Sequence, residues 1–213
     1  MTRILIVTAV AAERDALLAG LDQAQQAKVD VLACGVGAAA AAVATMAALA
    51  QATVEDPEGG YRLVISAGIG GAFPGRAELG DLIQADRIVA ADLGAQTAEG
   101  FASIARLGFG QPVDHTAKSL VGLADSITGT LLTVNTATGT AARTEQLMAQ
   151  YPEAIGEAME GYGVALAAQH FGVPVAELRA VSNLVGPRDR DAWQIPRALT
   201  ALTAAAGPLI EEN

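Results

Sequence analysis

Short apolar runs along this chain alternate with longer segments in which apolar residues recur every three to four positions. The short runs predict buried strands over residues 4–8, 29–34, 61–67, 131–135 and 173–181. Residues 81–91 alternate and then run apolar, as an edge or antiparallel strand does. The periodic segments predict helices over residues 11–21, 37–51, 140–150, 159–171 and 190–211, the last interrupted near Pro196 and stopped near Pro208.

Strands that alternate with helices predict an α/β fold: three α/β/α layers around a central mixed, mostly parallel twisted sheet. The 213 residues contain no linker and no repeat, so residues 1–213 are expected to form one domain. Residues 92–126 are the least regular segment and predict a long functional excursion, with a disordered surface loop as the alternative. The residues that interrupt this segment are Gly94, Gly100, Gly108, Gly110 and Pro112.

The strand predicted over residues 173–181 ends in Ser182 and Asn183, and Arg179 lies near its end. Ligands of open α/β proteins bind at the carboxyl ends of the strands. This polar cluster at the rim of an apolar core therefore predicts a functional site.

Two carboxylates stand near predicted helix starts. Glu13 follows the first strand, and Glu160 opens an otherwise apolar helix. The helix dipole favours a carboxylate at such a position without any function. The functional alternative places Glu13 at the same sheet edge as a glycine-rich segment, where it orients a water molecule.

Two glycine-rich segments follow predicted strands. Gly35, Gly37 and Ala40 fit a dinucleotide fingerprint, but the acidic residues at the expected distance, Glu55 and Asp56, fall in a turn. Close packing of a helix on a strand is therefore the favoured interpretation. The second segment, residues 68–71, lets backbone approach a ligand or forms a plain tight turn, and it lacks the Lys, Ser or Thr of a phosphate cradle.

Charge and composition exclude several classes of protein. The net charge of −10 argues against a nucleic-acid partner. Cys34 cannot form an intramolecular disulfide and is predicted to be a small buried residue rather than a nucleophile. His115 and His170 lie apart from other ligand types, which predicts surface or loop histidines and no metal site. No Gly-x-Ser-x-Gly motif of a serine hydrolase is present.

The amino-terminal residues lack the pattern of a signal peptide. The longest apolar stretch, residues 36–51, is mostly alanine and shorter than a bilayer requires. The expectation is a soluble cytoplasmic protein with no membrane partner.

Four motifs in this order resemble the nucleoside phosphorylase and nucleosidase superfamily over nearly the whole chain. They are Thr8-Ala-Val-Ala-Ala-Glu13, then Ser66-Ala-Gly-Ile-Gly-Gly71 with Gly80-Asp81, then Met159-Glu160, and finally Arg179-Ala-Val-Ser-Asn183. Residues 182–193 and 98–101 further resemble hydrolases of this superfamily that release hypoxanthine in menaquinone biosynthesis. The resemblance implies an N-glycosidase that needs no cofactor, acts on a nucleoside and water, and forms a homo-oligomer.

Departures from the wider superfamily sharpen this expectation. Phosphorylases hold phosphate with a Ser or Thr and an Arg, where this chain has Ile69 and Ala12. Methylthioadenosine/adenosylhomocysteine nucleosidases carry an Asp, which can protonate adenine, where this chain has Asn183. An amide offers a donor and an acceptor, which suits a 6-oxopurine. Water as nucleophile and hypoxanthine as leaving group are therefore favoured.

The resemblance also assigns roles. Glu13 would activate the water, Arg179 would help to place that water or hold Glu13, and Asn183 would bind the base. The other substrate-binding residues are Ile69, Gly70 and Gly71 beside the sugar, Met159 beneath it, Glu160 on its hydroxyls, Ser182 behind Asn183, and Phe101 stacked on the purine. Arg188 or Arg190 would pair with a substrate carboxylate or remain solvated.

Three alternatives remain at this point. Two are enzymes: a methylthioadenosine-type nucleosidase and a purine nucleoside phosphorylase. The third is a non-catalytic nucleotide-binding protein that uses the Gly35 segment.

Overall fold

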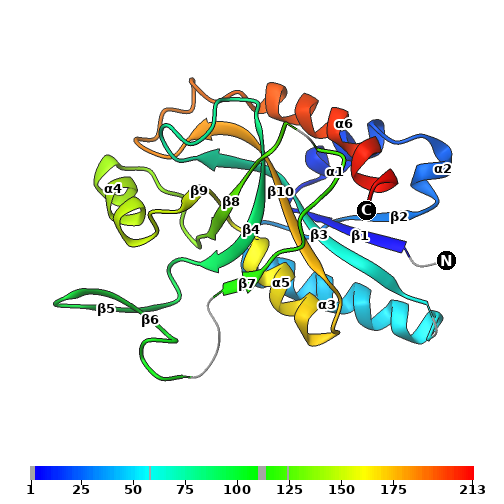
Figure 1. Cartoon of the computed structure of the whole chain (residues 1–213), viewed down its shortest axis with the longest axis horizontal. Helices are drawn as coiled ribbons and strands as arrows, with labels where there is room; N and C mark the ends of the chain where they lie inside the picture. Colours follow the sequence, from blue (N-terminus) through cyan, green and yellow to red (C-terminus); the bar gives the residue numbers. More distant parts are fainter. Residues whose placement is uncertain (1–2, 58, 110–113, 124) are drawn as a thin grey trace.

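The computed structural model of the chain describes residues 3–57, 59–109, 114–123 and 125–213. Its main sheet has the strand order β10-β4-β8-β9-β3-β1-β2, with β7 beside β4 and β10 also beside β3. Parallel pairing joins β1 to β2 and β3, β3 to β10, and β8 to β4 and β9, while β10 and β7 are antiparallel to β4, and β9 to β3. The mixed, mostly parallel α/β sheet is confirmed (Figure 1).

The elements follow one another in largely alternating order. The strands are β1 (Arg3–Thr8), β2 (Val29–Ala33), β3 (Tyr61–Ala72), β4 (Leu82–Ala90), β5 (Gly94–Thr97), β6 (Gly100–Ser103), β7 (Asp114–Thr116), β8 (Ile127–Thr133), β9 (Ala154–Ala158) and β10 (Val175–Leu184). The helices are α1 (Ala11–Ala19), α2 (Gln23–Gln26), α3 (Ala38–Glu55), α4 (Ala141–Gln150), α5 (Gly161–His170) and α6 (Ile195–Glu211).

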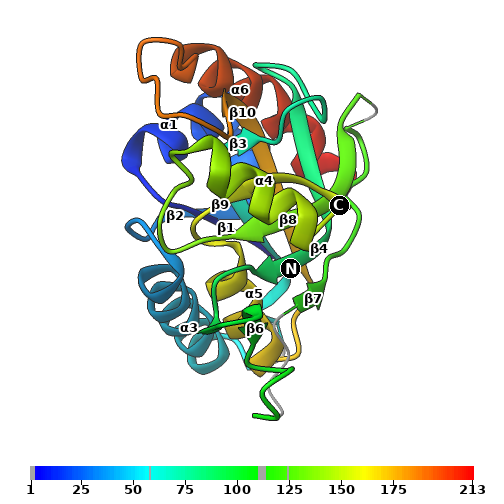
Figure 2. The ribbon, with the colours of Figure 1, turned by 90° about the vertical axis from the view of Figure 1, so that its left-hand side faces the viewer.

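Helices cover both faces of the sheet, with α1, α2 and α6 on one side and α3 and α5 on the other (Figures 1 and 2). Alternate side chains of β1 enter the two resulting cores. Ile4 and Ile6 pack with Leu17 of α1, while Leu5 and Val7 pack with the α3–α5 layer. Burial on both faces explains why β1 is a continuous apolar run rather than an alternating one.

The glycine segment 68–71 was predicted as a turn, but it continues β3. Each of its residues pairs with β10, so the backbone stays extended. A Cβ at Gly68 would lie 2.5 Å from Oε1 of Glu13, and one at Gly71 would lie 3.1 Å from Nδ2 of Asn183. The glycines therefore make room for neighbouring side chains instead of turning the chain.

Other strand predictions need smaller corrections. β4 is an interior strand rather than an edge, because it pairs with both β10 and β8, but its antiparallel pairing with β10 and β7 confirms the other alternative. β10 runs on through Ser182 and Asn183 instead of ending before them. The sequence pattern missed β9, whose Gly156 and Glu157 break the apolar run.

The last helix was also misjudged. α6 begins at Ile195, with Pro196 in its first turn, where the missing proline N–H leaves no bond unmade. Pro208 lies inside the helix, which continues to Glu211, so it does not stop the helix. Helix α5 also begins later than predicted, at Gly161, so Met159 and Glu160 precede it.

The irregular segment 92–126 contains the β5–β6 hairpin, which extends away from the two helical layers (Figure 1). Its Gly110 and Pro112 lie outside the described residues. The hairpin pairs Gln96 with Phe101 and forms a separate two-stranded sheet.

Helix α3 is longer than the sequence pattern suggested. Its 18 residues have a mean hydropathy of 1.3, enough by length and composition alone to cross a membrane. A single helix of this kind is weak evidence for a membrane span, and 17% of its residues are buried inside the structure. Here α3 packs on α5 and buries Ala41, Thr45 and Leu49.

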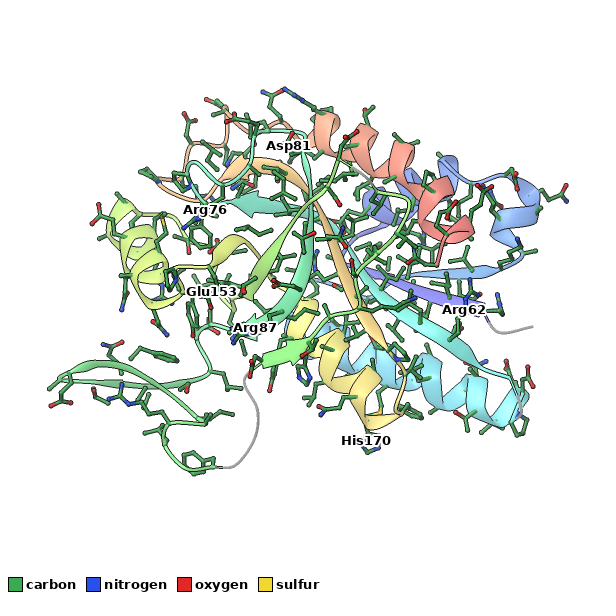
Figure 3. The ribbon with its side chains drawn as sticks, in the orientation of Figure 1. Arg62, Arg76, Asp81, Arg87, Glu153 and His170 are labelled. Atoms are coloured by element: carbon green, nitrogen blue, oxygen red, sulfur yellow. The ribbon has the colours of Figure 1, made fainter. Side chains whose placement is uncertain are left out.

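The two histidines differ in environment. His170 lies exposed at the end of α5, as expected (Figure 3). The surface or loop prediction for His115 is wrong, since it is buried in β7 with its ring centroid 5.2 Å from that of Tyr162. Burial lowers the pKa of His115, although Asp114 opposes the shift. The neutral imidazole is therefore the form that the folded chain favours.

We expect this burial to make stability sensitive to pH. A histidine whose pKa is lowered by folding stabilises the fold above its unfolded pKa of about 6.5, and that contribution is lost as the pH falls towards its folded pKa. The free energy of unfolding in urea should therefore fall less steeply below about pH 6.5 in His115→Gln than in the wild type. His170→Gln, at the exposed histidine, is the control and should follow the wild type. Equal slopes for His115→Gln and the wild type would contradict the prediction.

Candidate active site

A cavity of about 300 Å³ opens where several parallel strands reach their carboxyl ends. Segments far apart in the chain meet here, because the sheet brings the ends of β1, β3, β8, β9 and β10 to one edge. Another cavity, of about 330 Å³, lies at Arg3, Asp30 and Tyr61 and contains none of the predicted residues. The site cavity is lined by Ala9, Val10, Glu13, Val36, Ile69, Gly70, Gly71, Val134, Ala137, Thr138, Glu157, Ala158, Met159, Glu160, Ser182, Asn183 and Trp193.

Glu13 is held by backbone N–H groups near the carboxyl ends of β1 and β3. Oε2 accepts hydrogen bonds from the N–H groups of Ala9 (2.9 Å) and Val10 (3.1 Å). Oε1 accepts one from the N–H of Ile69 (2.9 Å), and the side chain is buried. A carboxylate oxygen can accept two hydrogen bonds, so Oε1 retains one free lone pair at the cavity wall.

Arg179 lies behind the cavity and is fully buried. Its Nε donates to Glu177 (2.9 Å), its Nη1 to Glu160 (3.2 Å), and its Nη2 to the hydroxyl of Ser66 (2.8 Å). The sequence suggested that Arg179 places the water or holds Glu13. The hydrogen bonds to Glu13 come from backbone N–H groups instead. The guanidinium of Arg179 bonds Glu160 and Glu177.

Negative charge exceeds positive charge around Arg179, because a single guanidinium lies near three carboxylates, those of Glu13, Glu160 and Glu177. Burial alone would lower the pKa of Arg179, but Glu177, Glu160 and Glu13 outweigh it and raise the pKa. The guanidinium therefore stays charged. Burial also raises the pKa of Glu177, against the opposing effect of Arg179.

Glu160 joins two parts of the chain. Its Oε2 accepts from Arg179, and its Oε1 accepts the N–H of Gly37 at 3.0 Å. Gly37 has a φ of 100°, and Gly35 has a φ of 93°, a region that L side chains rarely adopt. A Cβ at Gly37 would meet no atom within 4 Å. Backbone conformation, not the close packing expected from the sequence, therefore explains these glycines.

Ser182 and Asn183 form the polar pair expected at the end of β10. The Ser182 hydroxyl lies 2.8 Å from Oδ1 of Asn183 and 3.2 Å from the carbonyl of Gly70. Nδ2 of Asn183 donates to the carbonyl of Leu184 at 3.1 Å. The second hydrogen on Nδ2 remains available to a ligand.

Among the lining residues that the sequence analysis did not predict, Glu157 and Trp193 bear most on the chemistry of the cavity. Glu157 is buried in β9, and both of its oxygens accept hydrogen bonds from Thr138. The only sequence signal was a glutamate within an apolar segment, which had not been recognised as a strand. Trp193 was part of a motif but had no assigned role, and the guanidinium of Arg188 lies 5.8 Å from its ring centroid.

Some predicted residues lie apart from the cavity. Phe101 is on the projecting hairpin and is not among the lining residues, and neither is Ala12, an exposed residue of α1. Cys34 is half-buried rather than buried, and burial is the main cause that raises the pKa of its thiol to about 11. A thiol in this form is a poor nucleophile at neutral pH, as the sequence predicted. Within the described residues, no cluster of three metal-ligating side chains is present.

Comparisons with known proteins agree with this arrangement. A model of the Phosphorylase superfamily matches residues 23–211. A futalosine hydrolase from Streptomyces coelicolor is 52% identical over 184 residues, which cover 84% of this chain and 77% of that protein. One from Acidothermus cellulolyticus is 46% identical over 226 aligned residues, covering 96% and 89%.

Solved structures share the fold at low identity. A methylthioadenosine/adenosylhomocysteine nucleosidase from Colwellia psychrerythraea superposes with a TM-score of 0.79 at 20% identity and covers 100% of this chain and 97% of its own. Futalosine hydrolase from Helicobacter pylori also has a TM-score of 0.79, at 16% identity, with 100% and 98% covered.

The fold and the matched residues define the class: this chain belongs to the phosphorylase superfamily. Within that superfamily it belongs to the futalosine hydrolase family. The nucleoside phosphorylase-like fold and the N-glycosidase class expected from the sequence are thereby confirmed.

Proposed function

We propose that this protein hydrolyses the N-glycosidic bond of futalosine and releases hypoxanthine and dehypoxanthine futalosine, as a step of menaquinone biosynthesis. The observation that carries the proposal is the convergence of Glu13, Glu160 and Asn183 on one cavity large enough for a nucleoside. Membership of the futalosine hydrolase family supports the choice of substrate.

Glu13 is proposed as the general base. The free lone pair of its Oε1 accepts a proton from water, whose oxygen attacks C1′ of the ribose while the bond from C1′ to N9 breaks. The purine leaves as an anion that takes a proton from solvent, and Glu13 returns its proton to solvent before the next turnover. The three backbone N–H bonds fix the carboxylate, so little reorganisation accompanies the reaction. General base catalysis of this kind contributes roughly 10²–10⁴ in rate.

The excess of acid around Arg179 suits the transition state. The departing purine takes the bonding electrons, and positive charge develops on the ribose. Glu13 and Glu160 line the cavity, while the buried guanidinium behind it pairs with Glu160 and Glu177, so carboxylates outnumber the cation at this wall. Fixed negative charge beside a developing cation lowers the barrier. Glu160 also accepts hydrogen bonds from the ribose hydroxyls, and Met159 packs beneath the sugar.

Asn183 is proposed to bind the leaving base. Its free Nδ2 hydrogen donates to N7 or O6 of hypoxanthine and stabilises the negative charge that develops there. The Ser182 hydroxyl beside Oδ1 holds the amide in orientation. A carboxamide does not protonate the base at neutral pH, so it acts by hydrogen bonding alone.

Water rather than phosphate is the proposed nucleophile. Ile69 at the cavity wall has an apolar side chain, and Ala12 carries no group that could hold an anion. The rest of the described lining has no Lys or Arg. A phosphate dianion would therefore meet carboxylates without a compensating cation.

The proposal is tested by incubating the wild type and Asn183→Ala with futalosine, with and without phosphate, and separating the products. We expect free hypoxanthine and the free sugar, independent of phosphate. Asn183→Ala should lose about 1.5–3 kcal/mol of transition-state stabilisation, the contribution of a hydrogen bond to a charged group. A sugar phosphate would indicate a phosphorylase, and release only from adenine nucleosides would indicate a methylthioadenosine-type nucleosidase. Nucleotide binding without base release would indicate a non-catalytic protein.

We further propose a cytoplasmic homo-oligomer. Helix α3 leaves Val43 and Val54 exposed at 72% and 80%, and Met46 lies between them. Exposed apolar faces of this kind often mark subunit contacts. A neighbouring subunit could also bring Phe101 to a purine. Arg188, whose guanidinium lies beside Trp193 of the cavity lining, and Arg190 of the same loop are both exposed, and both remain candidates for the futalosine carboxylate.

A further inference from the structure

One buried carboxylate of the cavity has no part in the mechanism above. Glu157 of β9 is 6% exposed and lines the same cavity as Asn183. Within the part of the chain that the structure describes, no ion pair compensates it. Burying a charge without a partner destabilises a protein, so a structural role alone does not account for a glutamate here.

The hydrogen bonds of Glu157 leave room for a ligand. Oε1 accepts the N–H of Thr138 at 2.7 Å, and Oε2 lies 2.6 Å from the Thr138 hydroxyl. Each oxygen of an ionised carboxylate can accept one more hydrogen bond. Burial raises the pKa of Glu157, and the two bonds from Thr138 oppose that rise. A further donor supplied by a ligand would favour the ionised form in the same way.

Strand register sets Glu157 and Asn183 on either side of Gly71. Gly71 of β3 pairs with Glu157 on one side and with Asn183 on the other. Directly paired residues project from the same face of a sheet. Two strand spacings separate the two Cα atoms by roughly 10 Å, and the amide of Asn183 leans over Gly71, with Nδ2 3.1 Å from where a Gly71 Cβ would lie. All three residues line the site cavity, so a purine bound there is within reach of both side chains.

The chemistry of the two edges differs between purines. Hypoxanthine carries a hydrogen on N1, on the edge next to that of N7 with the C6 oxygen between them, whereas adenine has a lone pair at N1. We propose that Glu157 accepts the N1–H of the 6-oxopurine while Asn183 binds its N7 edge, so that Glu157 selects hypoxanthine over adenine nucleosides. This inference rests on the proposed function and names the group that sets its base specificity.

The proposal is tested with Glu157→Gln and three substrates: futalosine, its 6-amino analogue and its N1-methyl analogue. We expect the wild type to prefer futalosine over both analogues by at least about 10²-fold in kcat/KM, because the analogues leave Glu157 without a donor. Glu157→Gln should lose most of the preference over the 6-amino analogue, since its amide can donate to N1 of adenine, whereas the N1-methyl analogue should remain a poor substrate. Glu153→Gln is the matched control, because Glu153 begins the same loop-to-strand segment but is exposed and outside the cavity.

The outcomes separate this inference from the proposed function. No purine released from futalosine by the wild type would defeat the function. Release by the wild type with an unchanged substrate ratio in Glu157→Gln would defeat the role of Glu157. If kcat/KM of Glu157→Gln fell equally on all three substrates, Glu157 would contribute to the reaction without recognising N1. If Glu157→Gln fails to fold, calorimetry of wild-type binding to hypoxanthine and 1-methylhypoxanthine decides, and equal affinities would overturn the proposal.

Discussion

Glu13→Gln is expected to reduce kcat for hypoxanthine release by about 10²- to 10⁴-fold, the contribution of a general base. The amide cannot take a proton from water. It also has a single oxygen, whereas Glu13 accepts backbone hydrogen bonds on both oxygens. One buried N–H is therefore left facing an NH2 group, which should reduce the free energy of unfolding by about 1–3 kcal/mol. Single-turnover kinetics with futalosine would measure the chemical step.

Asp15→Asn is the matched control for this variant. Asp15 lies two residues further along α1, is exposed, and pairs with Arg14 at the surface. It should leave turnover unchanged. Binding of hypoxanthine by Glu13→Gln should survive, because Glu13 is assigned to the water and not to the base. Wild-type turnover in a folded Glu13→Gln would remove Glu13 from the mechanism.

Arg179→Met is expected to reduce the free energy of unfolding by about 3–5 kcal/mol, because it leaves buried carboxylates without their cation. Met keeps most of the side-chain volume, so the loss reports charge rather than packing. Arg179 bonds directly to Glu160 and Glu177 and is fully buried. Burial raises the pKa of Glu177, so as the pH falls Glu177 takes up a proton and the deficit should shrink towards about pH 4. Urea unfolding at several pH values measures both effects.

The control for Arg179→Met is Arg87→Met. Arg87 also pairs with two acids, Asp114 at 2.9 Å and Glu153 at 3.4 Å, but its side chain is 46% exposed (Figure 3). Exposed pairs contribute about 0–1 kcal/mol, so this variant should remain near wild-type stability. Similar losses in the two variants would mean that burial of the Arg179 network has no special energetic weight.

Most of the fold was predictable because each layer has a local signal. Strands such as β1 are buried on both faces and therefore read as continuous apolar runs, and α6 places its buried residues three or four positions apart. The failures have equally local causes. The glycines of β3 suggested a turn, and β9 contains a glycine and a charged residue within five positions.

The site was predictable to the extent that its residues stand where apolar segments end. Glu13, Glu160, Ser182 and Asn183 were found in this way, and all four line the cavity. Glu157 was not found, because its one local signal, a glutamate within an apolar segment, belongs to β9, and the glycine and charge of that strand hid it. Phe101 was chosen for its chemistry, and the hairpin that carries it projects from the body of the chain.

The sequence by itself determined the α/β layering and the chemical groups available for catalysis, because both depend on periodicity and residue type within short segments. Only the tertiary structure decided which groups meet. Arg179 of β10 bonds Ser66 of β3, and Gly71 of β3 pairs with both Glu157 and Asn183, through the register of strands distant in the chain. Register depends on how whole strands pack against one another, and no local pattern carries that information.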